Sequence, residues 1–237
     1  MHYQPLRIVY ECSTPVAGFS YPLHLDSLVA YAAVEFAMRQ PGLNPLQSKL
    51  AFVDEICADL PIAKEIRGDM FCYQASVLKP VKVGVHQARM FTRVTDIEHM
   101  SHQVEKGDLT GFTRKDLGPF GKIINIASGP YKNTLEFYPT RMVSKFEGFI
   151  VGDLDQLESY LNPSSGFVQY LGSKRRLGHG RISRFMIEPC TEASERWKER
   201  IVPWDDSGHV PIQSAVIPPY IEMSRRQVAY AHPAIFA

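Results

Sequence analysis

The spacing of apolar residues predicts which parts of the chain form strands and helices. Residues 6–11, LRIVYE, place Leu, Ile and Tyr at alternate positions, which is the period of a strand with one face in a core. Residues 25–36 carry apolar side chains at helical spacing, and Gln-Pro-Gly at 40–42 ends that predicted helix. A second helix is predicted over 45–60, with Asn44 as its N-cap. The N-terminal quarter is therefore expected to contain one strand and two helices.

The same patterns continue after a long interruption. From about 78 to 140 the periodicity is weak and glycines are frequent, which indicates an elaborated insertion. The segments with clear periodicity predict strands over 69–77, 140–153 and 181–189, and a helix over 153–161 that is capped by Asp153. Beyond residue 190 the chain is rich in proline and shows few periodic signals.

This order of elements predicts an α+β fold. Two β-α-β repeats are typical of a ferredoxin-like (RRM-like) core, an antiparallel sheet with both helices on one face. We expect this core to span residues 1–189, with the insertion, or thumb, at about 78–140. Residues 190–237 are expected to form an extended C-terminal tail that packs on the core. The second face of the sheet is expected to stay open for ligands.

Composition restricts the possible functions but does not identify one. The chain has 237 residues, 45% of them hydrophobic and 22% charged, and a net charge of +1, so polyanion binding would have to come from local patches. We expect no signal peptide and no membrane span, hence a cytoplasmic protein without a membrane partner. The four cysteines lie far apart and are expected to be small buried hydrophobes in a reducing compartment.

The most informative motif is YLGSKRRLGHGRI at 170–182. Three glycines in the spacing G-x5-G-x-G enclose three cations, and residues 172–184 contain no acid. Glycines permit close backbone approach, and successive N–H groups can converge on a phosphate oxygen, so the loop is expected to bind an RNA backbone. The predicted contact residues are Gly172, Ser173, Lys174, Arg175, Arg176, Gly178, His179, Gly180 and Arg181. The alternative is a solvated basic turn.

The loop resembles the glycine-rich loop of the CRISPR-associated RAMP superfamily. Residues 22–37, PLHLDSLVAYAAVEFA, are similar to the first-helix segment of the type IV effector proteins, and the resemblance covers about 5–77 and 140–189. It implies a non-catalytic subunit that holds the five-prime handle of the crRNA and caps a backbone filament, in defence against mobile genetic elements. The implied partners are the crRNA, the backbone filament RAMP subunit and the large subunit. Contact with target DNA near the protospacer-adjacent side is left open.

Relatives of this kind often carry a thumb that kinks the RNA, and the insertion is where we expect it. Its candidate RNA-binding cations are Lys79, Lys82, Arg89, Arg93, Arg114, Lys115 and Lys122. The aromatic residues Phe91, Phe112, Phe120 and Tyr131 are candidates for base stacking or for a small core under the insertion.

Two other functions are weighed. The first is a metal-independent endoribonuclease that processes precursor crRNA, for which His24 and His179 would be the acid–base candidates. The second is a free-standing RNA-binding protein, although aromatic RRM motifs are not evident. We expect no cofactor and no metal site, because His99 and His102 lack a third ligand at recognisable spacing.

Two charged features are assigned structural roles. Asp26 lies in the first turn of a predicted helix, where a carboxylate stabilises free N–H groups. The mixed charges at 192–206, which include Arg200, are interpreted as a solvated face.

Overall fold

The computed structural model describes residues 2–18, 22–40, 49–94, 102, 112–113, 122–123, 132–220 and 222–236. The chain forms two compact units. Unit 1 consists of residues 1–86 and 141–237, and unit 2 of residues 87–140. The fold is mixed α+β, with sheets whose recorded pairings are antiparallel. No helix in the described ranges is long and apolar enough to cross a membrane.

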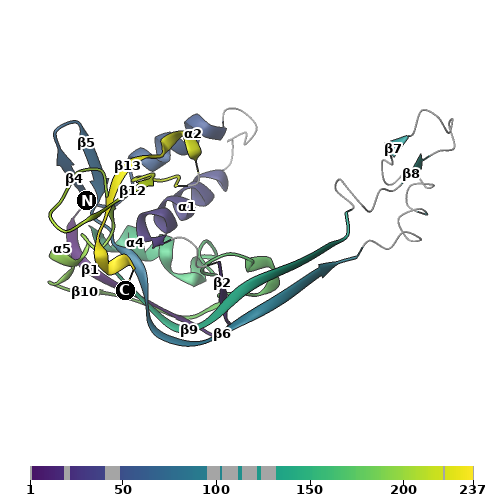
Figure 1. Cartoon of the computed structure of the whole chain (residues 1–237). Helices are drawn as coiled ribbons and strands as arrows, with labels where there is room; N and C mark the ends of the chain where they lie inside the picture. The colour runs from purple at the N-terminus through teal and green to yellow at the C-terminus, as the bar shows by residue number, and fades with distance from the viewer. Residues whose placement is uncertain are drawn as a thin grey trace. The chain divides into compact units, whose positions relative to one another are not determined.

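The largest sheet has six strands (Figure 1). Its order is β10-β1-β9-β6-β3, and β2 pairs with β9. The strands are β1 (Tyr3–Cys12), β2 (Val16–Ala17), β3 (Leu23–His24), β6 (Val77–Arg93), β9 (Thr134–Asp153) and β10 (Ile182–Pro189). The predicted strands at 6–11, 140–153 and 181–189 are therefore confirmed, and β1 lies between β9 and β10 because Leu6 is opposite both Ile150 and Pro189.

The helices follow the predicted apolar pattern. Those of eight or more residues in the described ranges are α1 (Leu25–Met38), α2 (Lys49–Ala58) and α4 (Leu154–Leu161). Asp153 caps α4 by accepting a hydrogen bond from the Gln156 N–H at 3.2 Å, as predicted. The predicted start of the second helix at 45–48 lies outside the described residues, and its described part begins at Lys49.

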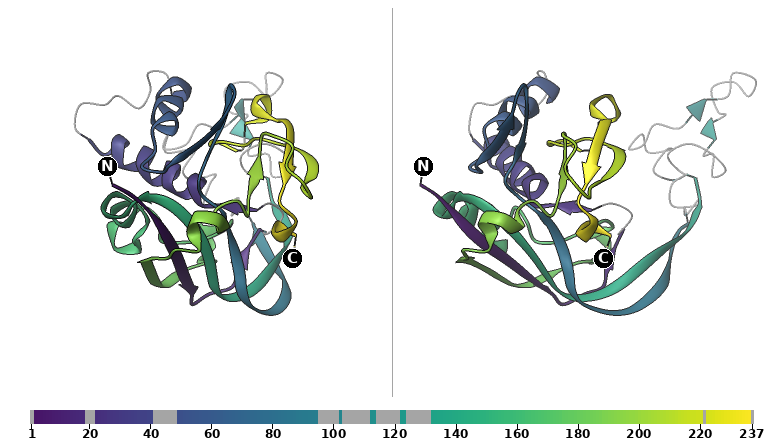
Figure 2. Two further views of the ribbon diagram at one scale, coloured as in Figure 1. Left: turned by 90° about the vertical axis from the view of Figure 1, so that its left-hand side faces the viewer. Right: turned by 60° about the vertical axis from the view of Figure 1, so that its left-hand side comes forward.

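Both α1 and α4 pack on one face of the six-stranded sheet (Figures 1 and 2). Alternate residues of β1, Leu6, Ile8 and Tyr10, are fully buried against this helical layer. The Tyr10 hydroxyl donates a hydrogen bond to the Leu161 carbonyl at 3.1 Å. This bond gives the polar end of a buried ring a partner and ties β1 to the end of α4.

The second face of the sheet is partly covered, so the expectation of an open face is wrong for this part. Val9 and Phe149 on that face are 1% and 2% exposed. Helix α5 (Ala193–Arg196) lies beside β1, and the Arg196 guanidinium sits 3.9 Å from the centroid of the Phe149 ring. Burial of this face needs residues beyond 190, whose fold the sequence did not reveal.

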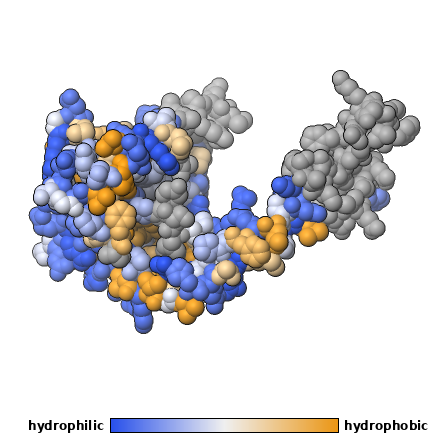
Figure 3. Space-filling model, in the orientation of Figure 1, coloured by the Kyte–Doolittle hydropathy of each residue, from blue (hydrophilic) through white to orange (hydrophobic). Residues whose placement is uncertain are grey.

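The strand predicted at 69–77 is also corrected. Residues 70–73 form β5 (Met70–Tyr73), which pairs with β4 (Lys64–Arg67) in a separate two-stranded sheet. The main sheet instead uses β6, which begins at Val77, the last residue of the predicted strand, and continues to Arg93 through the segment expected to be insertion. Val81, Val83 and Val85 of β6 alternate, yet they are 52%, 48% and 70% exposed. Figure 3 shows apolar side chains at the surface along the paired strands β6 and β9.

The C-terminal segment is more ordered than an extended tail. It forms an antiparallel sheet in the order β11-β13-β12, from β11 (Ile201–Val202), β12 (Val210–Ser214) and β13 (Gln227–Ala231). Trp197 and Trp204 pack with Cys72 and Val202 in a buried cluster. The tryptophans therefore anchor this segment to the rest of unit 1. The described ranges also contain the short 3-10 helices η3 (Pro163–Ser165), η4 (Arg175–Leu177), η5 (Met223–Arg225) and η6 (Pro233–Ile235).

Unit 2 contains residues 87–93 of β6 and 134–140 of β9, where the Thr140 hydroxyl donates to the Gln87 carbonyl at 3.0 Å. It also contains the two-stranded pair of β7 (Phe112–Thr113) and β8 (Lys122–Ile123). The insertion was expected over 78–140, whereas residues 78–86 belong to unit 1 as part of β6.

Candidate nucleic-acid interface

The glycine-basic loop is held against the turn that follows β1. The Thr14 hydroxyl donates to the Gly178 carbonyl and accepts from the Arg181 N–H, both at 2.8 Å. Two backbone bonds continue this attachment, from Ser173 N–H to the Ala17 carbonyl and from Gly180 N–H to the Pro15 carbonyl, each at 2.9 Å. Hydrogen bonds therefore attach the loop to residues 14–17 both before and after its basic tip.

Two of its glycines are required by close backbone approach. Gly172 and Gly180 have φ angles of +81° and +72°, in the left-handed region that favours glycine. A Cβ on Gly172 would lie 2.6 Å from the Ala17 carbonyl oxygen, and one on Gly180 would lie 1.9 Å from the Leu171 carbonyl oxygen. Gly178 shares the positive φ, at +81°, but a Cβ there would meet nothing within 4 Å.

The cations occupy the exposed tip of the loop. Lys174 adopts a φ of +55° and is the N-cap of η4, which carries Arg175 and Arg176. Both arginines and Arg181 are exposed. The Arg175 guanidinium lies 5.1 Å from the centroid of the Tyr31 ring on α1, a cation–π contact that restricts where its charge points. The loop therefore presents ordered positive charge to solvent.

Fewer backbone N–H groups of the loop are available to bind an anion than the sequence indicated. Those of Ser173, Leu177, Gly178 and Gly180 all donate to carbonyls within the protein. An anion nest formed by these four groups is therefore excluded while the loop keeps this conformation. The side chains of Lys174, Arg175, Arg176 and Arg181 are the part of the loop suited to phosphate.

His179 is directed into the protein. It is 9% exposed, and its Nδ1 lies 3.2 Å from the Pro15 carbonyl oxygen. The contact helps to hold the loop against the turn after β1. An imidazole in this position is poorly placed to shuttle protons for an external substrate.

The predicted cations of the insertion differ in their surroundings. Lys79 pairs with Glu199 at 2.5 Å, so its charge is already neutralised within unit 1. Lys82, Arg89 and Arg93 are exposed on β6. The remaining candidates fall outside what the structure describes, namely Arg114, Lys115 and the side chain of Lys122.

A buried ionic network lies at the start of α1, and sequence reasoning missed its centre. Arg200, expected on a solvated face, is 0% exposed and pairs with Asp26 at 3.1 Å. The Tyr220 hydroxyl donates to the same Asp26 oxygen at 2.7 Å. Burial opposes the charge on Arg200, but the Asp26 carboxylate outweighs this effect and raises the pKa of Arg200. Asp26 therefore acts structurally, through Arg200 rather than through the helix dipole alone.

His24 completes this network. Its ring stacks on Tyr220, with the centroids 4.3 Å apart and the planes 11° from parallel. Burial, followed by the positive charge of Arg200, holds the pKa of His24 well below its ordinary value of 6.5. The imidazole is therefore neutral at pH 7 and makes a poor general acid.

This burial predicts a pH dependence of stability. Because folded His24 is neutral, the unfolded chain binds one more proton below the ordinary pKa of 6.5, and stability falls as the pH drops from that value toward the lower folded pKa. The expected loss is at most about 1.4 kcal/mol per pH unit. Urea unfolding at several pH values between 5 and 8 measures it. His24→Phe, which keeps a ring on Tyr220, should show a shallower slope; equal slopes would contradict the assignment.

The described ranges give little support for a metal-binding site or for a reactive thiol. Within them no group of three or more His, Cys, Asp or Glu side chains is arranged to hold a metal ion. His99 lies outside these ranges, so the pair with His102 is not described. Cys12, Cys57 and Cys72 are buried, as predicted, whereas Cys190 is only half-buried. Burial raises the pKa of Cys12 to about 12. Such thiols are poor nucleophiles.

Comparison with known proteins identifies a matching family. A family model described as CRISPR type IV associated protein Csf3 matches residues 4–232. No curated protein matches the chain. The matched range includes the glycine-basic loop, the buried network and the C-terminal sheet.

Proposed function

Because the chain belongs to the Csf3 family of CRISPR type IV associated proteins, we propose that it binds the five-prime handle of the crRNA in a cytoplasmic type IV effector complex. In this role it caps the backbone filament and does not cut RNA. The observation that carries the proposal is the loop at 172–181, which holds Arg175 and Arg176 on an exposed turn fixed to the body of unit 1.

The fold supports this assignment as a RAMP-type subunit. Along the chain the principal elements follow the order β1-α1-β6-β9-α4-β10, and in the sheet β10, β1, β9 and β6 are successive neighbours. Both helices lie on one face (Figure 2). We assign this arrangement to the ferredoxin-like class. In it the glycine-basic loop connects the second helix to the last strand.

The positive charge of the loop and the restricted mobility of Arg175 both favour phosphate as the ligand. Arg175 is oriented by Tyr31, which lowers the conformational entropy lost when its guanidinium binds. Arginine forms paired hydrogen bonds to phosphate oxygens, and several such contacts release counterions from a nucleic acid. Backbone contacts of this kind hold an RNA without selecting its sequence.

The first test replaces Arg175 and Arg176 with alanine. Binding of crRNA is expected to weaken, and the slope of log affinity against log salt should shrink by about 0.7 for each lost phosphate contact. Both residues are exposed, so the free energy of unfolding should change by less than about 1 kcal/mol. Fluorescence anisotropy at several salt concentrations and a urea titration measure the two effects.

A matched control separates the loop from general charge. Arg176→Ala and Lys198→Ala each remove one positive charge, but Lys198 pairs with Glu195 on the C-terminal segment. Only the Arg176 variant is expected to lower RNA affinity and the salt slope. If both variants lose the same affinity, the loop is a basic turn of no special importance.

The second test concerns cleavage. Labelled repeat RNA incubated with the protein in EDTA is expected to remain intact, because His24 and His179 are both buried and His179 contacts the Pro15 carbonyl. Site-specific cleavage that is lost in His24→Phe or His179→Asn would instead establish the endoribonuclease function. Denaturing electrophoresis over several hours provides the measurement.

The partners of the proposal are the backbone filament RAMP subunit, the large subunit and the crRNA. Co-purification of the tagged protein with the other subunits, followed by sequencing of the bound RNA, tests them together. A bound RNA population with one common five-prime sequence supports handle binding. Random RNA ends would support a free-standing RNA-binding protein.

A further inference from the structure

Strand β6 has a free edge within unit 1. Its neighbour on one side is β9, and on the other side β3 pairs only with Val77 and Leu78. Among the residues that the structure describes, no strand continues this second side along residues 79–86. A strand directs the N–H and C=O groups of alternate residues to its two sides, so this edge carries a row of main-chain groups without a strand partner.

Three valines make one face of this edge apolar. Val81, Val83 and Val85 alternate along β6, so their side chains share a face, and they are between 48% and 70% exposed. The opposite edge of the sheet, β10, exposes the charged residues Arg184 and Glu188 instead. Long apolar edge strands attract other strands, and contiguous exposed apolar side chains mark interaction sites. The edge of β6 therefore has the properties of a binding surface.

The same stretch is positively charged. Residues 79–86 of β6 and 141–146 of β9 contain four Lys or Arg residues and no acid. Lys79 is already neutralised by Glu199. Lys82 is exposed, and in the described ranges it forms no ion pair. Because it alternates with the valines, Lys82 lies on the other face of β6. The edge thus combines an apolar face, a positive face and an unpaired main chain.

From these features we infer that residues 79–86 of β6 pair with a strand of a partner protein in which apolar and acidic residues alternate. The main chain of the added strand continues the ladder of the sheet, its apolar side chains cover the three valines, and its acids face Lys82. The stretch is long enough for a strand of about five or six residues, the usual length. The inference concerns a protein partner and does not depend on the proposed handle-binding function.

Other occupants satisfy only some of these features. A nucleic acid matches the positive charge, but it has no strand ladder and no apolar side chains for the valines. A second copy of β6 supplies valines and a ladder, but it brings two positive edges together, because residues 79–86 contain no acid. An alternating acidic strand satisfies the ladder, the valines and Lys82 at once.

The experiment uses the full chain and the peptide acetyl-Glu-Val-Glu-Val-Glu-Val-Glu-amide. Calorimetry measures its affinity, and hydrogen exchange followed by NMR locates it. The peptide is expected to bind and to slow amide exchange at alternate residues of 79–86. Two control peptides are expected to bind about tenfold more weakly or worse: one has Lys in place of each Glu, and the other, Glu-Glu-Val-Val-Val-Glu-Glu, keeps the composition without the alternation.

Pairing through the main chain is tested by two N-methylated versions of this peptide. One is methylated at its valines and the other at its inner glutamates. Only alternate N–H groups of an added strand face its neighbour, so one version should bind like the parent peptide and the other should lose about tenfold or more in affinity. Equal affinities of the two versions would exclude a strand ladder.

Variants of β6 test the side chains. Lys82→Glu should weaken binding about tenfold, because it places an acid against the glutamates of the peptide. Val85→Thr keeps the β-branched shape but replaces a methyl group with a hydroxyl, so it should weaken binding about threefold. Val228→Thr is the matched control, because Val228 is a 55% exposed valine on β13. It should bind the peptide like the unaltered chain.

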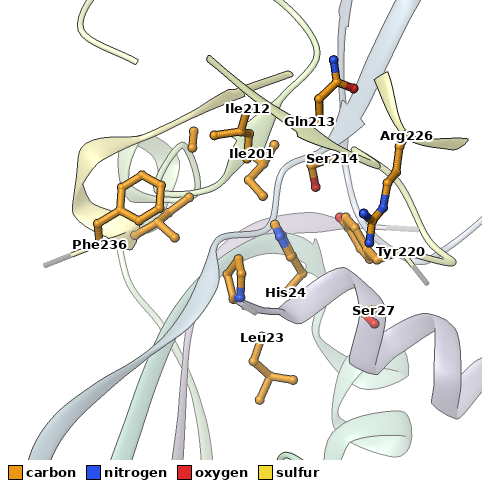
Figure 4. A pocket seen from close by; sticks show the side chains of 13 residues that line it. Leu23, His24, Ser27, Ile201, Ile212, Gln213, Ser214, Tyr220, Arg226 and Phe236 are labelled. Carbon is orange, nitrogen blue, oxygen red and sulfur yellow. The ribbon is translucent and has the colours of Figure 1, made fainter. Parts of the chain in front are cut away.

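A cavity of about 480 Å³ is another apolar site in unit 1 to which valine side chains could bind (Figure 4). It lies between the start of α1 and the C-terminal sheet, and its wall includes Ile212, Phe236 and the exposed Arg226. None of residues 79–86 lines it. Arg226→Glu is therefore the charge-reversal control for Lys82→Glu, and it should leave the affinity for the peptide unchanged.

Four results overturn the inference. They are absence of peptide binding at millimolar concentration, equal weakening by Lys82→Glu and Arg226→Glu, displacement of the peptide by an RNA of six uridines, and a dimer of the chain that Val85→Thr dissociates. The second would place the peptide in the cavity, the third would assign the edge to RNA, and the fourth would assign it to a second copy. Because no crRNA is present in these measurements, failure of the handle-binding proposal leaves their outcome unchanged.

Discussion

Replacing Gly180 with alanine is expected to destabilise the protein by between about 2 and 5 kcal/mol. The positive φ costs an ordinary residue about 1–2 kcal/mol, and forcing atoms into a packed site costs about 1–3 kcal/mol more. At Gly180 both penalties apply, because the φ is +72° and the new Cβ would lie 1.9 Å from the Leu171 carbonyl oxygen. The Leu171 N–H donates to the Gly180 carbonyl at 2.8 Å, so Leu171 is held against Gly180 and the Leu171 carbonyl cannot withdraw without straining this hydrogen bond.

Gly178→Ala is the matched control for this prediction. It has the same backbone requirement, a φ of +81°, but no atom within 4 Å of the new Cβ. A loss of about 1–2 kcal/mol is expected, from the φ penalty alone. Urea unfolding of both variants measures the difference. Equal losses would show that the backbone around Leu171 yields easily and that the loop is not fixed as described.

Replacing Arg200 with methionine is expected to cost about 3–5 kcal/mol, because it leaves the Asp26 carboxylate buried without its cation. The carbonyls of Ala75 and Val216, which accept from Arg200 at 3.0 and 2.7 Å, also lose a donor. Adding Asp26→Asn should restore part of the loss. A double-mutant cycle should therefore give a coupling energy of about 1–3 kcal/mol.

Lys198→Met provides the comparison at an exposed ion pair. Lys198 and Glu195 are 44% and 76% exposed, so the loss should stay below about 1 kcal/mol. Denaturant unfolding at neutral pH measures the free energy of unfolding of Arg200→Met, Asp26→Asn, their double variant and Lys198→Met. If Arg200→Met costs no more than Lys198→Met, water enters the network and the pair does not hold α1 to the C-terminal segment.

Local sequence patterns predicted those elements whose apolar periodicity or cap residue lies within the element itself. The alternation at 6–11 and the capped apolar repeat at 153–161 correspond to β1 and α4, since their buried faces repeat regularly. The position of the glycine-basic loop before β10 was also accessible, because its glycine spacing is unusual. The sequence could not show which glycines are sterically constrained, since Ala17 and Leu171 approach Gly172 and Gly180 only in the folded chain.

The failures arise where distant parts of the chain decide burial. Arg200 lies in a stretch of mixed charge that has the composition of a surface, and its partner Asp26 is 174 positions away. Tyr220 is half-buried, its hydroxyl belongs to the same network, and no local pattern in the sequence marks it. The strand β6 was available from the alternation of Val81, Val83 and Val85, but their exposure departs from the usual half-buried pattern. The cavity beside His24 likewise forms only where α1 meets the C-terminal sheet.

The placement of β1 between β9 and β10 sets an order of events during synthesis. The first strand emerges from the ribosome early, but the residues that pair with Leu6 are Ile150 and Pro189. At about 5–20 residues per second, the strand waits on the order of ten seconds for both neighbours. Pairings this distant in sequence also slow folding itself. During that interval the apolar face of β1 lacks the two neighbouring strands that flank it in the folded chain.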